Sequence, residues 1–355
     1  GRHICMVLKA TCDNMEGTLE QEVILTAENG VELGGMITED LTLYPNVHYI
    51  VTSPMGVSDG VTLTLKPGVK IDFKINHKVF SLAQNAKLIA HGKPDSLIVF
   101  YSTGDGRVEM YLNGVTLKYC KFENLNNDGF LLGAPSLENV IISNITSTHL
   151  LAGGGSPFRC KSIIKSNITN VDVPQGNYNN GLVVANTATH NNFCNNNIGG
   201  AVVTDANYQN IGINNNIVNH KKHFYSNGSS PKVIDIPQYW GSNKENIIRQ
   251  KFSDMESGSG FYYYDLSTRL SRPNPEAHGI VWKVVVNGYD AQDEFEMLPP
   301  LGIGKHKFEV YFNRPMDTSV VPHISMGVRS PYTQNAISED GSWSADSTIY
   351  TAYLS

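Results

Sequence analysis

The chain has 355 residues, more than one average domain, so either two domains or one long solenoid is expected. Charged residues make up only 17% of the sequence and the formal net charge is −6, with no basic face in the spacing of Lys and Arg, which argues against nucleic-acid binding. No apolar run is long enough to span a bilayer, and the run at residues 4–8 is too short for the core of a signal peptide.

Cysteine usage gives no sign of a metal site. The five cysteines are Cys5, Cys12, Cys120, Cys160 and Cys194. They form no CxxC motif and are odd in number, so neither a zinc site nor a full disulfide framework is predicted. Cys120 and Cys194 fall in apolar positions of a repeat described below, and we expect them to be small core residues.

The N-terminal part of the chain carries short strand patterns of two kinds. Residues 1–40 show mixed patterns, and we expect them to cap the open end of a solenoid, because an exposed terminal coil invites edge pairing. Residues 60–71 alternate apolar and polar side chains on both sides of a Pro-Gly turn, and similar short runs follow within residues 86–102.

In residues 60–71 and 86–102 the chain resembles the right-handed parallel β-helix (pectin-lyase-like) proteins of bacterial cell surfaces. The resemblance covers roughly residues 41–270. It implies an all-β fold built on a single-stranded parallel β-helix. Because this scaffold serves lyases, hydrolases, adhesins and inert stalks alike, the resemblance predicts the fold and leaves the activity to be argued from individual sites.

Asparagines followed by an aliphatic residue recur through the middle of the chain. They are Asn124, Asn144, Asn167, Asn197 and Asn216. Their steps of 20, 23, 30 and 19 residues are close to the contour of one solenoid coil. Asparagine tolerates left-handed backbone angles and its amide can bond to the next amide in a stack, so we predict that the five residues share one bend.

The residues three and four positions before each of these asparagines are mostly apolar, which predicts a short strand with an inside and an outside. From this pattern we expect Ile141, Ile164 and Ile213 to point into the core.

The solenoid is predicted to end near Tyr239, Trp240 and Gly241. Ile247, Ile248 and Phe252 then form a short helical stripe that is suited to plug the end of the core. Trp240 has two interpretations, a capping side chain or a platform on which a sugar ring stacks.

A different pattern follows two closely spaced prolines, which suggest a linker. It contains an apolar run, an Asn-Gly hairpin signal and a strand within residues 306–317 that resembles bacterial Ig-like domains. We therefore predict a cap at residues 1–40, a β-helix at 41–272 and a β-sandwich-like (Ig-like) module at 273–355, which is small or shortened.

Polysaccharide lyases on such a scaffold need a base, usually Lys or Arg, beside the uronate carboxylate, and cations or Ca²⁺ to neutralise it. Lys118, Glu138 and Lys161 stand at equivalent positions of the asparagine repeat, and Arg159 shares a strand face with Lys161. Lys161 is the candidate base and Arg159 its cationic neighbour. The alternative is a solvated face that pairs its own charges. No paired carboxylates of the glycosidase type are recognisable.

One basic run, His220, Lys221, Lys222 and His223, is followed by two aromatic residues. This run can bind an acidic glycan by charge and stacking, with Trp240 as a further candidate, or it can be a loop of solvated charges.

The sequence therefore favours a secreted or cell-surface β-helix protein that contacts a glycan or a protein partner without cleaving it. A polysaccharide lyase or related carbohydrate-active enzyme acting on an acidic glycan is the alternative, and an inert stalk is a third. The expected partner is a polysaccharide, the expected state is a monomer, and no cofactor is expected apart from Ca²⁺ if the protein is a lyase.

Overall fold

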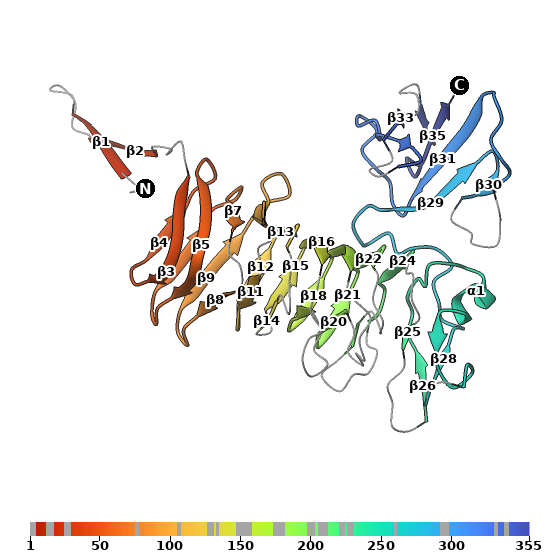
Figure 1. Ribbon diagram of the computed structural model, residues 1–355, viewed down its shortest axis with the longest axis horizontal. Helices are drawn as coiled ribbons and strands as arrows, with labels where there is room; N and C mark the ends of the chain where they lie inside the picture. Colours follow the sequence, from red (N-terminus) through yellow and green to blue (C-terminus); the bar gives the residue numbers. More distant parts are fainter. Residues whose placement is uncertain are drawn as a thin grey trace.

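The computed structural model describes residues 5–11, 18–24, 30–74, 78–104, 108–125, 131–132, 135–146, 158–172, 182–196, 203–204, 212–219, 224–225, 231–258, 261–291, 298–329, 333–336 and 341–354. The molecule is an elongated row of stacked parallel strands that leads to a smaller C-terminal sheet (Figure 1). One short α-helix, α1 (Glu245–Arg249), interrupts this all-β arrangement in the described part of the chain.

The parallel strands lie on three faces, and the chain visits each face once per coil. The first face is formed by β4 (Leu41–Leu43), β6 (Thr62–Leu65), β9 (Lys87–His91), β12 (Thr116–Lys118), β15 (Ser136–Glu138), β18 (Ser162–Ile164) and β21 (Thr187–Thr189). The second face is formed by the first half of β5 (His48–Val57), β7 (Lys70–Phe73), β10 (Ile98–Tyr101), β13 (Cys120–Glu123), β16 (Ile141–Thr146), β19 (Asn167–Asp172), β22 (Asn192–Cys194) and β24 (Asn216–Val218). The third face is formed by the second half of β5, β8 (Lys78–Leu82), β11 (Val108–Tyr111), β14 (Leu131–Leu132), β17 (Phe158–Arg159), β20 (Val183–Val184) and β23 (Val203–Thr204).

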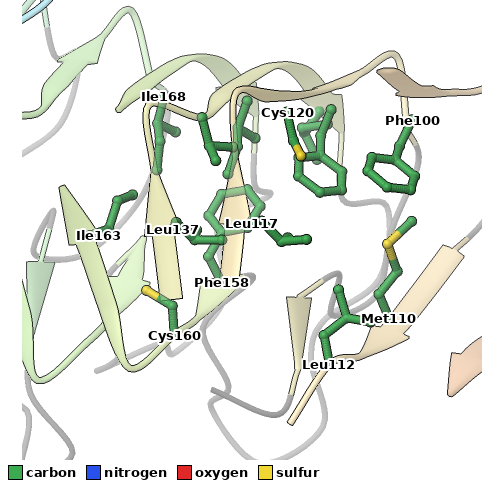
Figure 2. Close-up of a cluster of buried hydrophobic side chains, with 14 of the residues drawn as sticks. Phe100, Met110, Leu112, Leu117, Cys120, Leu137, Phe158, Cys160, Ile163 and Ile168 are labelled. Carbon is green, nitrogen blue, oxygen red and sulfur yellow. The ribbon is translucent and has the colours of Figure 1, made fainter. Parts of the chain in front are cut away.

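This topology confirms the predicted parallel β-helix. Along strands such as β9, β10 and β11 buried apolar residues alternate with more exposed residues, so that every second side chain faces the interior. Inside the second face Phe100 stacks on Phe122 with ring centroids 4.8 Å apart. Side chains from the three faces meet in one continuous core, as Figure 2 shows for Phe158, Ile163 and their neighbours.

A column of asparagines does lie at one bend, and Asn124 and Asn144 belong to it as predicted. The later asparagines of the prediction do not, because the strand register differs from the predicted one. Asn144 lies beside Asn170, not Asn167, and the two side chains are hydrogen-bonded at 3.2 Å. The column at the bend is Asn124, Asn144, Asn170, Asn195 and Asn219, each with φ between 54° and 55°. Asn167 and Asn216 belong to a second column, three residues earlier in the strand, and Asn197 lies outside the described residues. The left-handed bend predicted for asparagine is therefore present, at shifted positions.

The inward positions also differ from the prediction by one residue. Ile163 is fully buried, whereas its neighbour Ile164 is partly exposed. Ile141 is likewise partly exposed, and Ile213 is 51% exposed. Since the side-chain period of a strand is two, a shift of one residue exchanges inside and outside.

Parallel pairing starts before residue 41, within the segment expected to be a cap. β3 (Val31–Ile37) pairs in parallel with β5, and it is preceded by an antiparallel pair, β1 (Cys5–Thr11) and β2 (Thr18–Ile24). β3 covers the end of the stack, so that the edge of β5 is not left open.

The C-terminal end of the core is closed by α1 and by aromatic side chains. Ile248 of α1 is fully buried, as the predicted apolar stripe requires. Trp240 is 3% exposed and packs edge-on against Phe252 and Tyr264. Two short parallel pairs surround this plug, β25 (Phe224–Tyr225) with β27 (Phe252–Ser253) and β26 (Lys232–Asp235) with β28 (Tyr262–Asp265).

The C-terminal sheet is antiparallel, which agrees with the all-β module expected there, while its Ig-like identity stays a prediction. It contains five strands in the order β30 (Tyr289–Asp290), β29 (Val281–Val286), β31 (His306–Phe312), β35 (Ile349–Leu354) and β34 (Ser342–Trp343). A separate pair is formed by β32 (Ser325–Met326) and β33 (Asn335–Ala336). The predicted hairpin joins β29 to β30, with positive φ at both Asn287 and Gly288.

Cys120 and Cys194 are buried, as expected for core residues, and Cys160 is buried as well; burial raises the pKa of each thiol to about 12. Within the described part of the chain, no helix has the length and apolarity needed to cross a membrane.

Candidate functional site

The two residues predicted as a catalytic pair, Arg159 and Lys161, are both exposed and alternate with buried Phe158 and Cys160. Arg159 lies in β17 on the third face, where its in-register partner is Val184. Lys161 lies in the bend between β17 and β18, so the two exposed cations do not share one strand. Neither lines the hollows described below.

The polar column expected to join Lys118, Glu138 and Lys161 is only partly formed. Lys118 and Glu138 are adjacent on the first face, and their charged groups lie 2.6 Å apart. The next residue in that column is Ile164 instead of Lys161. Lys118 and Glu138 thus form the solvated face with paired charges that was the alternative interpretation.

The remaining predicted binding residues divide into two groups. The run His220, Lys221, Lys222 and His223 lies outside the described residues. Trp240 is described, and its burial in the aromatic plug leaves too little of the ring exposed for a sugar to stack on it. The structure thus favours the capping interpretation of this residue.

The segment expected to be a linker is docked on the β-helix. Pro273 and Asn274 are buried, and Asn216 of β24 exchanges two hydrogen bonds with the backbone of Asn274, one accepted at 2.6 Å and one donated at 3.2 Å. The side chain of Asn192 donates to the carbonyl of His278 at 2.9 Å. The second asparagine column therefore holds the segment that leads into the C-terminal sheet against the second face.

His278 lies within this junction. Burial, and then the positive charge of Arg314, lower its pKa below the usual range of an imidazole. Asn313 of the C-terminal sheet donates to the carbonyl of His278 at 3.1 Å. A neutral histidine is therefore packed between the two parts of the chain at neutral pH.

Trp282 is placed by a break in the strand register. Val281 pairs with Phe312 and Lys283 pairs with Tyr311, so Trp282 is the extra residue of a β-bulge in β29. Bulges bend a strand and re-aim a side chain. The indole ring lies edge-on to Tyr239 of the β-helix, with ring centroids 5.9 Å apart, and edge-on to Tyr311 at 6.1 Å.

Two adjoining hollows meet at Trp282, in the groove between the β-helix end and the C-terminal sheet. They have volumes of about 370 Å³ and about 500 Å³, which is the size range of small-molecule sites. Asn243, Ser271, Trp282 and Lys283 line both hollows. We call the two hollows together the junction groove.

The junction groove is more basic than the rest of the chain. Its basic side chains are Lys244, Lys251, Arg272 and Lys283, and its acidic side chains are Asp290 and Asp346. Lys283 forms an ion pair with Asp290 at 3.4 Å, and its ammonium lies 5.7 Å from the centre of the Tyr311 ring. In a chain with a net charge of −6, this local excess of cations favours an anionic ligand.

The groove offers binding chemistry, namely an aromatic ring, amides, hydroxyls and ammonium groups. Burial, and then the charge of Asp290, raise the pKa of Tyr239, so its phenol stays protonated and can donate a hydrogen bond. Calcium prefers several oxygen ligands together, and the described residues contain no group of three or more His, Cys, Asp and Glu side chains placed for a metal ion.

Sequence reasoning did not identify this site. Trp282 lies in the apolar run before the Asn-Gly signal, and a bulge leaves no mark in such a run. The Asn-Gly signal and the two prolines did mark the segments that border the groove, but nothing in them indicated that those segments meet.

The family model for the pectate-lyase like β-helix domain matches residues 35–117. The match agrees with the predicted resemblance over that part of the chain, and the parallel pairing continues beyond it to β24. Comparisons with curated proteins and with solved structures found no match. A bacterial cell-surface origin stays a prediction.

Proposed function

We propose that this chain is a secreted or cell-surface β-helix protein whose junction groove binds an acidic polysaccharide. The observation that carries the proposal is the position of Trp282, which a bulge places between two hollows lined by an excess of basic side chains. An aromatic ring beside cations and amides provides both of the contacts that a uronate-type sugar needs: an apolar ring face and partners for its carboxylate.

In this arrangement one sugar of the polymer contacts the indole of Trp282, and the sugars before and after it occupy the two hollows. Lys251 and Lys283 line the first hollow and Arg272 the second, so that successive carboxylates meet separate cations. Such contacts are partly solvated, and salt screens them over about 10 Å at 0.1 M ionic strength and about 3 Å at 1 M. Binding should therefore be strong at low salt and weak at high salt.

The test is a binding titration of the full chain with polygalacturonate and with a neutral polysaccharide of similar length, at low and high salt. Trp282→Ala should weaken binding to the acidic polymer at least about tenfold, which is about 1.4 kcal/mol. Tyr111→Ala is the matched control, because Tyr111 is an exposed aromatic residue (38% exposed) on the third face, outside the groove.

Lys283→Ala should weaken binding to the acidic polymer and leave binding to the neutral one unchanged. Lys305→Ala, an exposed lysine outside the groove lining, should bind like the parent protein. Equal affinity of the parent and Trp282→Ala, or equal affinity for both polymers, would contradict the proposal.

A further inference from the structure

The segment between the β-helix and the C-terminal sheet is a joint that both parts of the chain hold. We call residues 273–280 the docking segment; it passes beside β22 and β24 before β29 begins (Figure 1). The carbonyl of His278 accepts hydrogen bonds from both sides, from Asn192 of the β-helix at 2.9 Å and from Asn313, which follows β31, at 3.1 Å. His278 therefore stands where the two parts meet.

The docking segment belongs with the C-terminal sheet. The N–H of Ile280 donates to Oδ1 of Asn313 at 2.8 Å, and the guanidinium of Arg314 donates to the carbonyl of Ala277 at 3.2 Å. Because β29 starts at the residue after Ile280, the segment and the sheet would move as one unit. A separation of the two parts would therefore break the contacts between the docking segment and the β-helix.

Those contacts are hydrogen bonds of side-chain amides and one aromatic pair. Asn216 and Asn192 bond the backbone of the docking segment, and the amide of Asn274 donates to the carbonyl of Asn214 at 2.7 Å. The edge-on contact of Trp282 adds to them. Hydrogen bonds that can be exchanged for bonds to water give only modest net stabilisation, so a single added charge can shift such a docking equilibrium measurably.

The imidazole of His278 lies between two cations. Lys165 is at the bend between β18 and β19, and Arg314 bonds the residue just before His278. Burial lowers the pKa of His278 most, the charge of Arg314 lowers it further and that of Lys165 adds a smaller effect, while a hydrogen bond between the imidazole and the backbone of Lys165 opposes them. Among the described residues, the charges that act on His278 are these two, so protonation would place a third positive charge between them.

Two further titratable groups lie near the docking segment. His190 and Glu276 line a hollow of about 330 Å³ beside it. Nδ1 of His190 lies 2.8 Å from the hydroxyl of Thr189, within the β-helix. His190 is therefore the histidine against which the role of His278 can be compared.

We propose that this joint is an acid-sensitive switch, in which protonation of His278 releases the docking segment and the C-terminal sheet from the second face of the β-helix. In the released state the imidazole regains contact with water and loses its cationic neighbours, so it binds a proton at a higher pH than in the docked state. The docked state is therefore fully favoured above about pH 6.5 and becomes less favoured as the pH falls below that value. Return to neutral pH restores docking.

Release would also take the junction groove apart. Val218 and Tyr239 line its first hollow from the β-helix, whereas Trp282 and Lys283 line it from the C-terminal sheet. A ligand that contacts both walls would leave in acid. This consequence rests on the proposed function, whereas the switch does not, and the switch is tested without a ligand.

The experiment measures amide hydrogen exchange of the full chain by mass spectrometry at about pH 7.5 and about pH 5.5, either side of the usual pKa of an imidazole. Rates are corrected for the intrinsic pH dependence of exchange. The corrected rate of residues 271–280 should rise at least about tenfold in acid, because the amide of Asn274 loses its bond to Asn216 on release. Peptides from β13 and β16 should stay equally protected at both pH values, because these strands belong to the core of the β-helix.

His278→Gln should exchange at the same corrected rate at both pH values, and the matched control His190→Gln should keep the acid response of the parent protein. Lys165→Gln should reduce that response, because it removes one flanking cation. Its control is Lys93→Gln, an exposed lysine between β9 and β10 in an earlier coil, which should respond like the parent.

The proposal is overturned if the parent protein shows equal corrected rates at both pH values, or if His278→Gln keeps the full acid response. It is also overturned if β13 and β16 lose protection together with residues 271–280, since acid would then unfold the whole chain. Should His278→Gln already be open at neutral pH, Lys165→Gln decides: an acid response as large as that of the parent would contradict the switch.

Discussion

The orientation of β18 is tested by truncating two adjacent isoleucines. Ile163 is fully buried between Leu137 and Ala188, its in-register partners on the first face. Replacing it by alanine removes the apolar contacts and leaves a cavity, which costs about 2–5 kcal/mol. We expect the upper half of that range, because the flanking strands are fixed by backbone ladders and Ala188 is too small to fill the space. Ile164→Ala, which changes a partly exposed side chain of the same type, should cost about 1 kcal/mol or less.

Urea unfolding followed by far-ultraviolet circular dichroism measures this difference. Both variants should unfold with the slope of the parent protein, while the midpoint of Ile163→Ala falls to clearly lower urea. Because the two substitutions remove the same atoms from neighbouring positions, propensity and unfolded-state effects largely cancel in the comparison. An equal shift for both variants, or a larger one for Ile164→Ala, would refute the inward assignment of Ile163.

Three further outcomes are expected. Asn216→Ala should weaken the docking of the segment before the C-terminal sheet by about 1–3 kcal/mol, because two backbone groups of Asn274 lose their hydrogen-bond partner. Limited proteolysis near residues 271–277 should then be faster than in the parent protein, and an unchanged cleavage rate would count against the docking role. The folded-state pKa of His278 lies below its unfolded value, so the unfolded chain binds more protons and the free energy of unfolding should fall as the pH drops through about 6.5. His278→Gln should reduce the dependence of the unfolding free energy on pH in this range. A variant with the same pH dependence as the parent protein would rule out His278 as the cause. The three buried thiols, with pKa values near 12, should resist alkylation at neutral pH until the chain unfolds, which mass spectrometry can follow.

The coil architecture could be predicted because it repeats a local rule. Alternating side chains recur along the stack and left-handed asparagine bends recur in the coils from β13 to β24, and both depend on neighbouring residues only. The closing plug was readable in part: Ile248 and Phe252 are both buried, but α1 ends at Arg249 and Phe252 lies in β27, so the predicted helical stripe is shorter than expected.

The register was misread where two asparagines compete for the same role. Asn167 and Asn170 are both followed by an aliphatic residue, so either one fits the repeat. We assigned the first of them, Asn167, to the bend. The structure takes the second, because the strands align their buried residues, Ile142 with Ile168, and this places Asn170 at the bend. Ile164 was counted from Asn167, which does not lie at the bend, whereas Ile141 was counted from Asn144, which does; the inward assignment of Ile141 was therefore a separate error of one residue, and its neighbour Ile142 is the buried one.

The sequence by itself determined the all-β class, the parallel β-helix, the aromatic closure of its end and the antiparallel segment after it, because each of these follows from short-range periodicity and turn chemistry. Only the tertiary structure decided which residues can act together. His278 stands beside Lys165 of the β-helix and Arg314 of the C-terminal part, and they meet because the docking segment packs across the second face. Trp282 faces the junction groove because a bulge turns it and because asparagines of the second face hold the docking segment against the β-helix. Contacts of this kind depend on the packing of distant segments, and no local pattern in the chain records them.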